Sequence, residues 1–203
     1  YDCYQRATWT PAVADTPKGP MVYVAALDLF GGLYALNATS QPLSNKDRIV
    51  WIGTGGTCQY CVAFFGGPIV HDGVVYMQYT FSWGPGFGGL YAFNATTGKV
   101  LTGWPVMIIG ADYMTVSSPV IAGNGILYIA AGLENTIGPI YAVNLATRTT
   151  LAGWPYFCNL GVYGPPAIYN GAIYVGSVDG IVYKIGPPPP APNLAIGLGD
   201  VVT

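Results

Sequence analysis

GGLYAFNATTGKVLTGWP, residues 88–105, reads as two short strands on either side of a turn. Residues 90–93 are apolar around Tyr91, residues 94–98 carry turn-forming Asn and Gly, and residues 99–104 lead to Trp104. This pattern predicts an antiparallel β-hairpin. One hairpin cannot bury its own apolar face, so it needs further copies to pack against. Weaker copies of the stretch recur along the chain, and we therefore expect a repeat protein.

Four landmarks recur in a fixed order and define a repeat of four strands. The first is a proline followed by two apolar residues, at Pro11, Pro68, Pro119 and Pro166. A strand centred on tyrosine follows, at Tyr23, Tyr76, Tyr128 and Tyr174, and then a second one, at Tyr34, Tyr91, Tyr141 and Tyr183. The last is a tryptophan, at Trp51, Trp104 and Trp154. Spacings of 53, 52 and 46 residues in the first tyrosine series fit one four-stranded sheet per repeat.

The repeat count predicts an all-β fold, a four-bladed β-propeller. The blades cover approximately residues 11–56, 66–109, 118–158 and 165–186. The fourth blade stops after its third strand, because the prolines after Gly186 cannot extend a ladder. Residues 3–9 precede Pro11 just as residues 99–104 precede Pro119, so we expect them to form a displaced fourth strand. That strand would complete the last blade and close the ring.

The repeat resembles the PQQ-like (quinoprotein-like) β-propeller family. The resemblance rests on a Pro-led strand, a Gly turn, an apolar Tyr strand, then Tyr-Ala-x-Asn-x-x-Thr-Gly-Lys and a closing Trp, best matched by residues 91–104. It implies a propeller blade and says little about chemistry. The quinone-dependent enzymes of that family resemble eight-bladed rings, and half a ring would lack their enclosed cofactor site. We therefore expect no cofactor, although two half-rings could pair.

Composition narrows the classes of function. Charged residues make up 8% of the 203 residues and the net charge is -2 without basic runs, so we expect no nucleic-acid partner. No apolar run reaches the roughly 18 residues of a membrane span. The chain starts at Tyr1 rather than Met, so we expect a secreted, extracellular mature form whose signal peptide has been removed.

The four cysteines suit an oxidising compartment. Spacing alone does not fix their pairing, and Cys58 and Cys61 also have the spacing of a redox or zinc half-site. No βαβ unit surrounds them, so we favour structural disulfides over a metal site. We expect Cys58 to bridge to Cys61 and Cys3 to Cys158, the second bridge holding the N-terminal strand on the last blade.

Two Asn-Ala-Thr sequences are candidate N-glycosylation sites in a secreted chain, at Asn37 and Asn94. A surface poor in charge needs another source of solubility. The alternative is that each Asn starts the turn by bonding its own backbone.

A proline-rich spacer, residues 187–192, leads to a tail at residues 193–203. As a strand, the tail would place large apolar residues on one face and small ones on the other. We expect it to add to a sheet edge of a neighbouring copy, with subunit contacts at Leu194, Ile196, Leu198 and Val202. The alternatives are a disordered tail, a linker to another domain, or a strand folded back on its own ring.

Few residues suit catalysis. The only histidine, His71, aligns with turn residues of the other repeats, and Asp179-Gly180 reads as a hairpin turn. Asp28 and Asp112 fall in loops without the spacing of a calcium loop. We expect no catalytic residue and no metal site.

The tryptophans that recur, including Trp9, are expected to pack between blades. Trp83 lies in a loop special to the second repeat and is the candidate for a ligand contact.

The sequence thus favours a non-enzymatic subunit of an extracellular filament, a homopolymer linked by its C-terminal strand. The alternative is a cell-surface adhesion or glycan-binding propeller, with surface glycans as partners. A half-ring of a quinone-dependent dehydrogenase is the third hypothesis.

Overall fold

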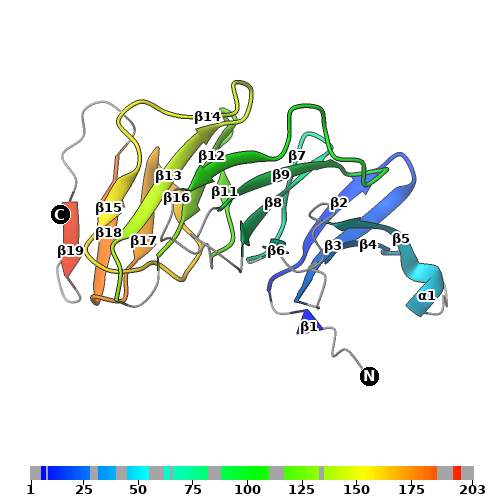
Figure 1. The fold of residues 1–203 in the computed structure, drawn as a ribbon, viewed down its shortest axis with the longest axis horizontal. Helices are drawn as coiled ribbons and strands as arrows, with labels where there is room; N and C mark the ends of the chain where they lie inside the picture. Colours follow the sequence, from blue (N-terminus) through cyan, green and yellow to red (C-terminus); the bar gives the residue numbers. More distant parts are fainter. Residues whose placement is uncertain are drawn as a thin grey trace. The chain divides into compact units, whose positions relative to one another are not determined.

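The structure is a computed structural model of the chain. It describes residues 6–7, 9–27, 32–39, 45–54, 62–64, 66–81, 88–109, 117–132, 135–186 and 194–197. The chain divides into two compact units, residues 1–111 and 112–203, and each unit contains two antiparallel sheets. Figure 1 shows the strands of each sheet lying side by side.

The first sheet contains the first repeat. Its β3 strand is paired on one side with β4 and on the other with β1 and β2, and β5 pairs with β4. A single helical turn, α1, precedes β5. The bounds are β1 (Arg6–Ala7), β2 (Ala12–Thr16), β3 (Gly19–Leu27), β4 (Gly32–Asn37), α1 (Asn45–Arg48) and β5 (Ile49–Thr54).

The second sheet follows the same plan. Its β8 strand pairs with β9 on one side and with β6 and β7 on the other, and β10 pairs with β9. The bounds are β6 (Val62–Phe64), β7 (Ile69–His71), β8 (Val74–Phe81), β9 (Gly88–Asn94) and β10 (Val106–Ile109).

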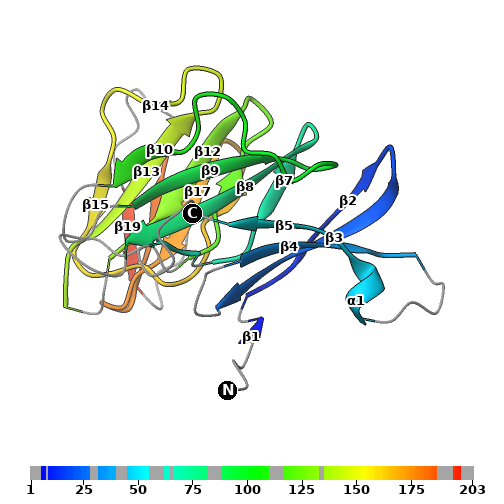
Figure 2. The same ribbon diagram turned by 45° about the vertical axis from the view of Figure 1, so that its right-hand side comes forward.

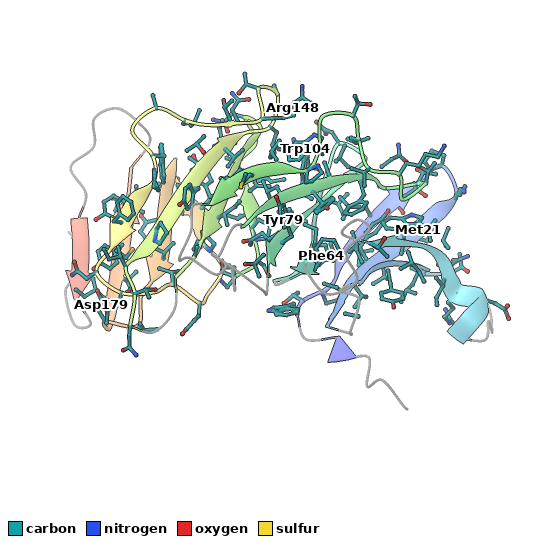
Figure 3. All side chains as sticks on the ribbon, viewed as in Figure 1. Met21, Phe64, Tyr79, Trp104, Arg148 and Asp179 are labelled. Carbon is teal, nitrogen blue, oxygen red and sulfur yellow. The ribbon has the colours of Figure 1, made fainter. Side chains whose placement is uncertain are left out.

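Aromatic side chains fill the space between these two sheets. Tyr23 and Phe93 are fully buried, and Trp51 stacks on Phe93 with ring centroids 6.2 Å apart. Phe64 meets the same ring edge-on. Figure 3 shows Met21 and Phe64 among the side chains of this first core. Because β9 is buried on both faces, its sequence is a continuous apolar run rather than an alternating one.

The third and fourth sheets form the second unit. In the third, β12 pairs with β11 and β13, and β13 also pairs with β14 and β15. In the fourth, the order is β16-β17-β18-β19. The bounds are β11 (Val120–Ile121), β12 (Ile126–Ala130), β13 (Gly138–Asn144), β14 (Thr149–Thr150), β15 (Tyr156–Cys158), β16 (Ala167–Tyr169), β17 (Ala172–Gly176), β18 (Ile181–Ile185) and β19 (Leu194–Gly197).

A second core lies between these sheets. Tyr128, Ile140 and Ala142 of the third sheet and Ile173 and Tyr183 of the fourth belong to it. The predicted strands therefore exist, and each Pro-led and Tyr-centred segment takes the place in its sheet that the repeat assigned to it.

The predicted role of residues 3–9 as a fourth strand of the last sheet is wrong. Arg6 and Ala7 pair with Leu27 and Ala26, in the first sheet. In the first sheet, the pair Ala7↔Ala26 comes before the pair Ala12↔Tyr23. In the second sheet, the pair Phe64↔Tyr79 comes before the pair Ile69↔Tyr76 with the same spacing on both strands. Arg6 and Ala7 thus belong to the beginning of the first repeat, and Trp9, which packs against the first core, is not a member of the tryptophan series.

The last position of the fourth sheet belongs to β19. Its four residues pair with Ile181–Lys184 of β18 in antiparallel register, from Ile181↔Gly197 to Lys184↔Leu194. Figure 2 shows this short red strand. Of the alternatives for the tail, the structure has the strand that folds back on its own sheet.

Among the described residues, no helix has the length and the apolar character needed to cross a membrane.

Candidate functional site: the outer edge of the fourth sheet

The turns that lead to the outermost strand are held by backbone N–H groups. In the second sheet, the backbone N–H groups of the four consecutive residues after Asn94 donate hydrogen bonds. Ala95 N–H bonds the Gly73 carbonyl at 2.9 Å, and Gly98 N–H bonds the Asn94 carbonyl at 2.8 Å. Between them, the N–H groups of Thr96 and Thr97 bond Asn94 Oδ1 at 3.0 and 2.9 Å. The bonds to Asn94 close the hairpin, and the bond to Gly73 ties the turn to the residue before β8.

The third sheet repeats this arrangement around Asn144. Leu145 N–H bonds the Gly125 carbonyl at 3.1 Å, and Arg148 N–H bonds the Asn144 carbonyl at 2.7 Å. Ala146 and Thr147 donate to Asn144 Oδ1 at 2.9 and 3.1 Å. Arg148, labelled in Figure 3, has a φ of 62° where Gly98 has 71°. The same four positions therefore donate hydrogen bonds in both turns.

The fourth sheet lacks all four donors. The pairs Val75↔Phe93, Leu127↔Val143 and Ile173↔Ile185 are equivalent, so Gly186 stands where Asn94 and Asn144 stand. The next four residues are Pro187, Pro188, Pro189 and Pro190. Proline has no N–H group. The sequence therefore cannot form the repeat's turn at the one place where β18 meets the C-terminal strand.

The outer side of β18 is an edge that a strand can extend. Its ladder to β19 consists of four residue pairs without a bulge. Val182 is 37% exposed and Tyr183 is buried, so the strand alternates between solvent and the second core. Of the predicted subunit contacts, Leu194 and Ile196 lie on β19, whereas Leu198 and Val202 lie outside the described residues.

The predicted disulfides receive no support from Cys158. This cysteine is free, 1% exposed, and paired opposite Gly138 in the third sheet. Burial, and then the charge of Asp179, raises the pKa of its thiol to about 12. The expected bridge to Cys3 is therefore absent at this end, while Cys3, Cys58 and Cys61 lie outside the described residues.

Both candidate glycosylation residues act as turn formers. Asn37 Oδ1 accepts a bond from Thr39 N–H at 2.9 Å, and Asn94 Oδ1 accepts from Thr96 and Thr97. The alternative role in the turn is thus confirmed for both. Attachment of a glycan stays a prediction.

Each recurring tryptophan contacts a tyrosine of its own repeat, and packing between blades is seen for Trp51, which stacks on Phe93 of the second sheet. Trp51, Trp104 and Trp154 meet Tyr23, Tyr76 and Tyr128 with ring centroids 5.7, 5.6 and 5.6 Å apart. Trp104 is labelled in Figure 3. Trp83 lies outside the described residues, and its role as a ligand contact stays a prediction.

His71 was expected in the turn but is the last residue of β7, directly before the turn residues Asp72 and Gly73. Its Nε2 lies 3.4 Å from Asp72 Oδ2, and Asp72 is 89% exposed. A pair so open to water contributes little to stability.

Asp179, labelled in Figure 3, lies in the turn between β17 and β18. Its Oδ1 accepts from Ile181 N–H at 2.9 Å, and its Oδ2 accepts from the Tyr183 hydroxyl at 2.7 Å. Burial would raise the pKa of Asp179, but these hydrogen bonds outweigh it and lower the pKa. Burial and the bond to Asp179 raise the pKa of Tyr183 to about 12. Both pKa values move away from neutrality, where general acid–base catalysis is most efficient.

Within the described part of the chain, no three His, Cys, Asp or Glu residues gather into a group that could hold a metal ion. Asp28 and Asp112 lie outside it.

Comparisons with known proteins bear on the fold. No protein-family model matches the sequence, and no curated protein sequence matches it. Among solved structures, the Dos1 propeller superposes with a TM-score of 0.57 at 10% identity, over 93% of this chain and 48% of that one. The chain has a β-propeller fold.

Other propeller-like structures extend the comparison. The computationally designed Ika4 protein superposes with a TM-score of 0.55 at 15% identity, over 91% of this chain and 92% of that one. Quinohemoprotein alcohol dehydrogenase from Comamonas testosteroni gives 0.54 at 12% identity, over 91% of this chain and 42% of the enzyme. The propeller spans less than half of the Dos1 and dehydrogenase chains. These superpositions support a PQQ-like propeller fold, and identities this low carry no activity across.

Sequence reasoning found the blades of the propeller but missed the meaning of its four prolines. It treated residues 187–190 only as a spacer. Aligning Ile185 with Phe93 and Val143 would have shown that the prolines replace the four donors of the blade turn.

Proposed function

We propose that this propeller is a non-catalytic structural subunit of an extracellular assembly, in which each copy supplies its C-terminal strand to the fourth sheet of the next copy. The proposal is carried by one observation: the four residues whose N–H groups donate hydrogen bonds in the outer turns of the second and third sheets are prolines in the fourth.

Proline also opposes the turn through backbone shape. A residue that precedes proline is driven to extended conformations, and a proline run advances about 3.1 Å per residue. Neighbouring strands lie only about 4.8 Å apart. The connection within one hairpin must reverse direction over this short distance, and a stiff extended segment opposes that. A connection that runs from one molecule to another does not have to reverse direction.

Strand exchange keeps every bond of the ladder. The pairs from Ile181↔Gly197 to Lys184↔Leu194 are the same whether β19 comes from its own chain or from another copy. Exchange of identical elements is a low-cost route to association, and head-to-tail exchange that does not close a ring gives a fibre. A filament of copies is the expected product.

Grafting a working turn onto the fourth sheet tests the proposal. The variant carries the turn of the second sheet, through the changes Gly186→Asn, Pro187→Ala, Pro188→Thr, Pro189→Thr and Pro190→Gly. The grafted turn supplies the missing donors and favours pairing of β19 with β18 of its own chain over exchange, so we expect monomers where the unmodified chain forms assemblies. Sedimentation velocity and negative-stain imaging of the full chain measure this.

A matched control changes the turn of the third sheet to the same sequence, by Leu145→Ala, Ala146→Thr and Arg148→Gly. This variant should assemble as the unmodified chain does. The proposal fails if the graft leaves the assemblies unchanged, or if the unmodified chain is monomeric at every concentration.

Removing residues 193–203 gives a second measurement. The shortened chain should not assemble, and a synthetic peptide of residues 193–203 should bind to it at one copy per chain. Assemblies that persist without the tail would show that another surface connects the copies.

A further inference from the structure

One face of the first sheet is apolar although it is turned away from the first core. Residues that pair across antiparallel strands point to the same side of a sheet. Two rows make up this far face: Val13, Val22 and Leu36, and then Val24, Tyr34 and Ile52. The residues that alternate with them, such as Tyr23 and Ala35, belong to the first core. Val13 is 66% exposed and Ile52 is 49% exposed. A sheet face left in water usually carries polar residues, so this one has the composition of an interface.

The fourth sheet also has a far face, turned away from the second core. Tyr174 pairs with Lys184 on this face, and Val182 lies two residues before Lys184 on the same strand. Tyr183, which alternates with them, belongs to the second core. Val182 is 37% exposed, and Tyr169, which lies on this face of β16, is 67% exposed. This face is therefore largely apolar and aromatic as well.

The far face of the fourth sheet repeats the side of the third sheet that packs in the second core. The equivalence follows from the pairs Tyr128↔Ala142 and Tyr174↔Lys184. Position by position, Tyr174, Val182 and Lys184 stand for Tyr128, Ile140 and Ala142.

The far face of the first sheet repeats the side of the fourth sheet that meets the third. The equivalence follows from the pairs Val22↔Leu36 and Ile173↔Ile185. Position by position, Val22, Tyr34 and Leu36 stand for Ile173, Tyr183 and Ile185. The two far faces are thus the two halves of the contact that forms the second core.

The two far faces carry charges of opposite sign. Lys184 lies on the far face of the fourth sheet. Asp15 is exposed on the far face of the first sheet, since Ala14 before it packs against the first core. The net charge of the chain is only -2, so copies of the chain repel one another little. Opposite charges favour packing of one far face on the other.

The second unit indicates where these two charges meet. Asp15 corresponds to the residue before Gly171. Lys184 corresponds to Ala142, whose carbonyl accepts a hydrogen bond from Leu151 N–H at 2.8 Å. Gly171 and Leu151 line the same cavity. When the far faces pack as the second core does, Asp15 and Lys184 therefore come close to each other.

We propose that the far face of the first sheet packs on the far face of the fourth sheet in a second copy of this chain, with Asp15 beside Lys184. The strand that carries Val182 and Lys184 is β18, which also pairs with β19, so an exchanged strand brings the second copy to this face.

The inference rests on the proposed function, because the contact is weaker than the second core. The fourth repeat has no tryptophan, and Lys184 stands where the third sheet has the small Ala142. The far faces therefore need the exchanged strand to hold the copies together.

Reversal of the two charges tests the contact. Asp15→Lys and Lys184→Glu should each prevent assembly at concentrations where the unmodified chain assembles, because like charges then meet. The double variant restores opposite charges and should assemble again. Sedimentation velocity of the full chains measures this. Single variants that assemble as the unmodified chain does, or a double variant that stays monomeric, would overturn the proposal.

Val13→Lys gives a second test with a matched control. Met107 is 65% exposed, as Val13 is, but it lies on β10, outside both far faces. Val13→Lys should lose assembly, because it buries a charge in the contact, whereas Met107→Lys should assemble normally. Equal assembly of the two variants contradicts the proposal. A monomeric Val13→Lys chain that unfolds at lower urea than Met107→Lys also contradicts it, since the face would then be covered within its own chain.

A synthetic peptide of residues 193–203 separates this inference from the proposed function. The peptide should bind the chain that lacks these residues, with or without Val13→Lys. Peptide binding together with normal assembly of full-length Val13→Lys would reject the face contact alone. Failure of the peptide to bind the shortened chain would reject strand exchange, and the face contact with it.

Discussion

The Tyr23 hydroxyl donates a hydrogen bond to the carbonyl of Ala95, 3.0 Å away and 72 residues further along the chain. The bond joins the inner face of the first sheet to the turn of the second. Trp51 Nε1 donates to the same oxygen, so the turn that makes the hairpin also anchors the neighbouring sheet.

Replacing Tyr23 by phenylalanine should weaken this anchor. Tyr23→Phe keeps the ring contact with Trp51 and removes one buried hydrogen bond, which is worth about 0.5–1.5 kcal/mol. We expect the free energy of unfolding in urea to fall by that amount. Tyr174→Phe is the control, because Tyr174 is only half-buried; an equal loss in both variants would contradict a specific role for the Ala95 bond.

Gly98 should tolerate no side chain. Its φ is 71°, and an added Cβ would lie 2.6 Å from the Trp51 ring. Gly98→Ala therefore meets both the left-handed penalty of about 1–2 kcal/mol and a clash that displaces Trp51. A lower melting temperature and altered tryptophan fluorescence are the expected results.

The equivalent Arg148 supplies the matched comparison for Gly98. Its backbone is also left-handed, but its side chain is exposed. Arg148→Gly should change the melting temperature far less than Gly98→Ala. Similar effects would mean that backbone conformation alone, and not the Trp51 contact, decides the cost.

Cys158 should be unreactive until the protein unfolds. It is 1% exposed and its pKa is raised to about 12, so the thiolate is scarce at neutral pH. Thiol labelling of the native chain should be slow at this residue and become complete in urea without reductant. If labelling of Cys158 in urea requires reductant, the residue is in a disulfide after all.

Acid should remove the contribution that Asp179 makes to the stability of the folded chain. Its native pKa lies below the ordinary value of 3.8, so the unfolded chain takes up the proton first as the pH falls. The stabilisation is complete above that ordinary value and is lost as the pH drops through the lower native pKa. We expect unfolding midpoints of the unmodified chain to fall over this range.

Asp179→Asn should lack this acid-dependent part of the stability. Plotted against pH, the unfolding midpoints of the variant and of the unmodified chain should therefore approach each other at low pH. Curves that stay parallel over the whole range would show that other carboxyl groups cause the acid dependence.

The repeat could be predicted from sequence because its landmarks are local. The tyrosine strands and the Asn-led turns depend on alternation, apolar runs and turn chemistry within a few residues. The packing of Trp51 against the neighbouring sheet could be predicted too, because the tryptophan recurs at one place in the repeat. The partner of Asp179 could not, since the bond to Tyr183 depends on how the turn places its carboxylate.

Local sequence patterns do not decide which sheet each end of the chain joins. Trp9 looked like the tryptophan before Pro119, yet the register of Ala7 with Ala26 places its segment in the first sheet. Which strand takes a free edge depends on competition between segments far apart in sequence, and no local pattern records its outcome.

The sequence by itself determined four repeats of antiparallel strands, because strand and turn preferences act between near neighbours. Only the tertiary structure decided which strand completes the fourth sheet and what the prolines replace. Both depend on register between β17, β18 and β19, and register is fixed by burial against a neighbouring sheet.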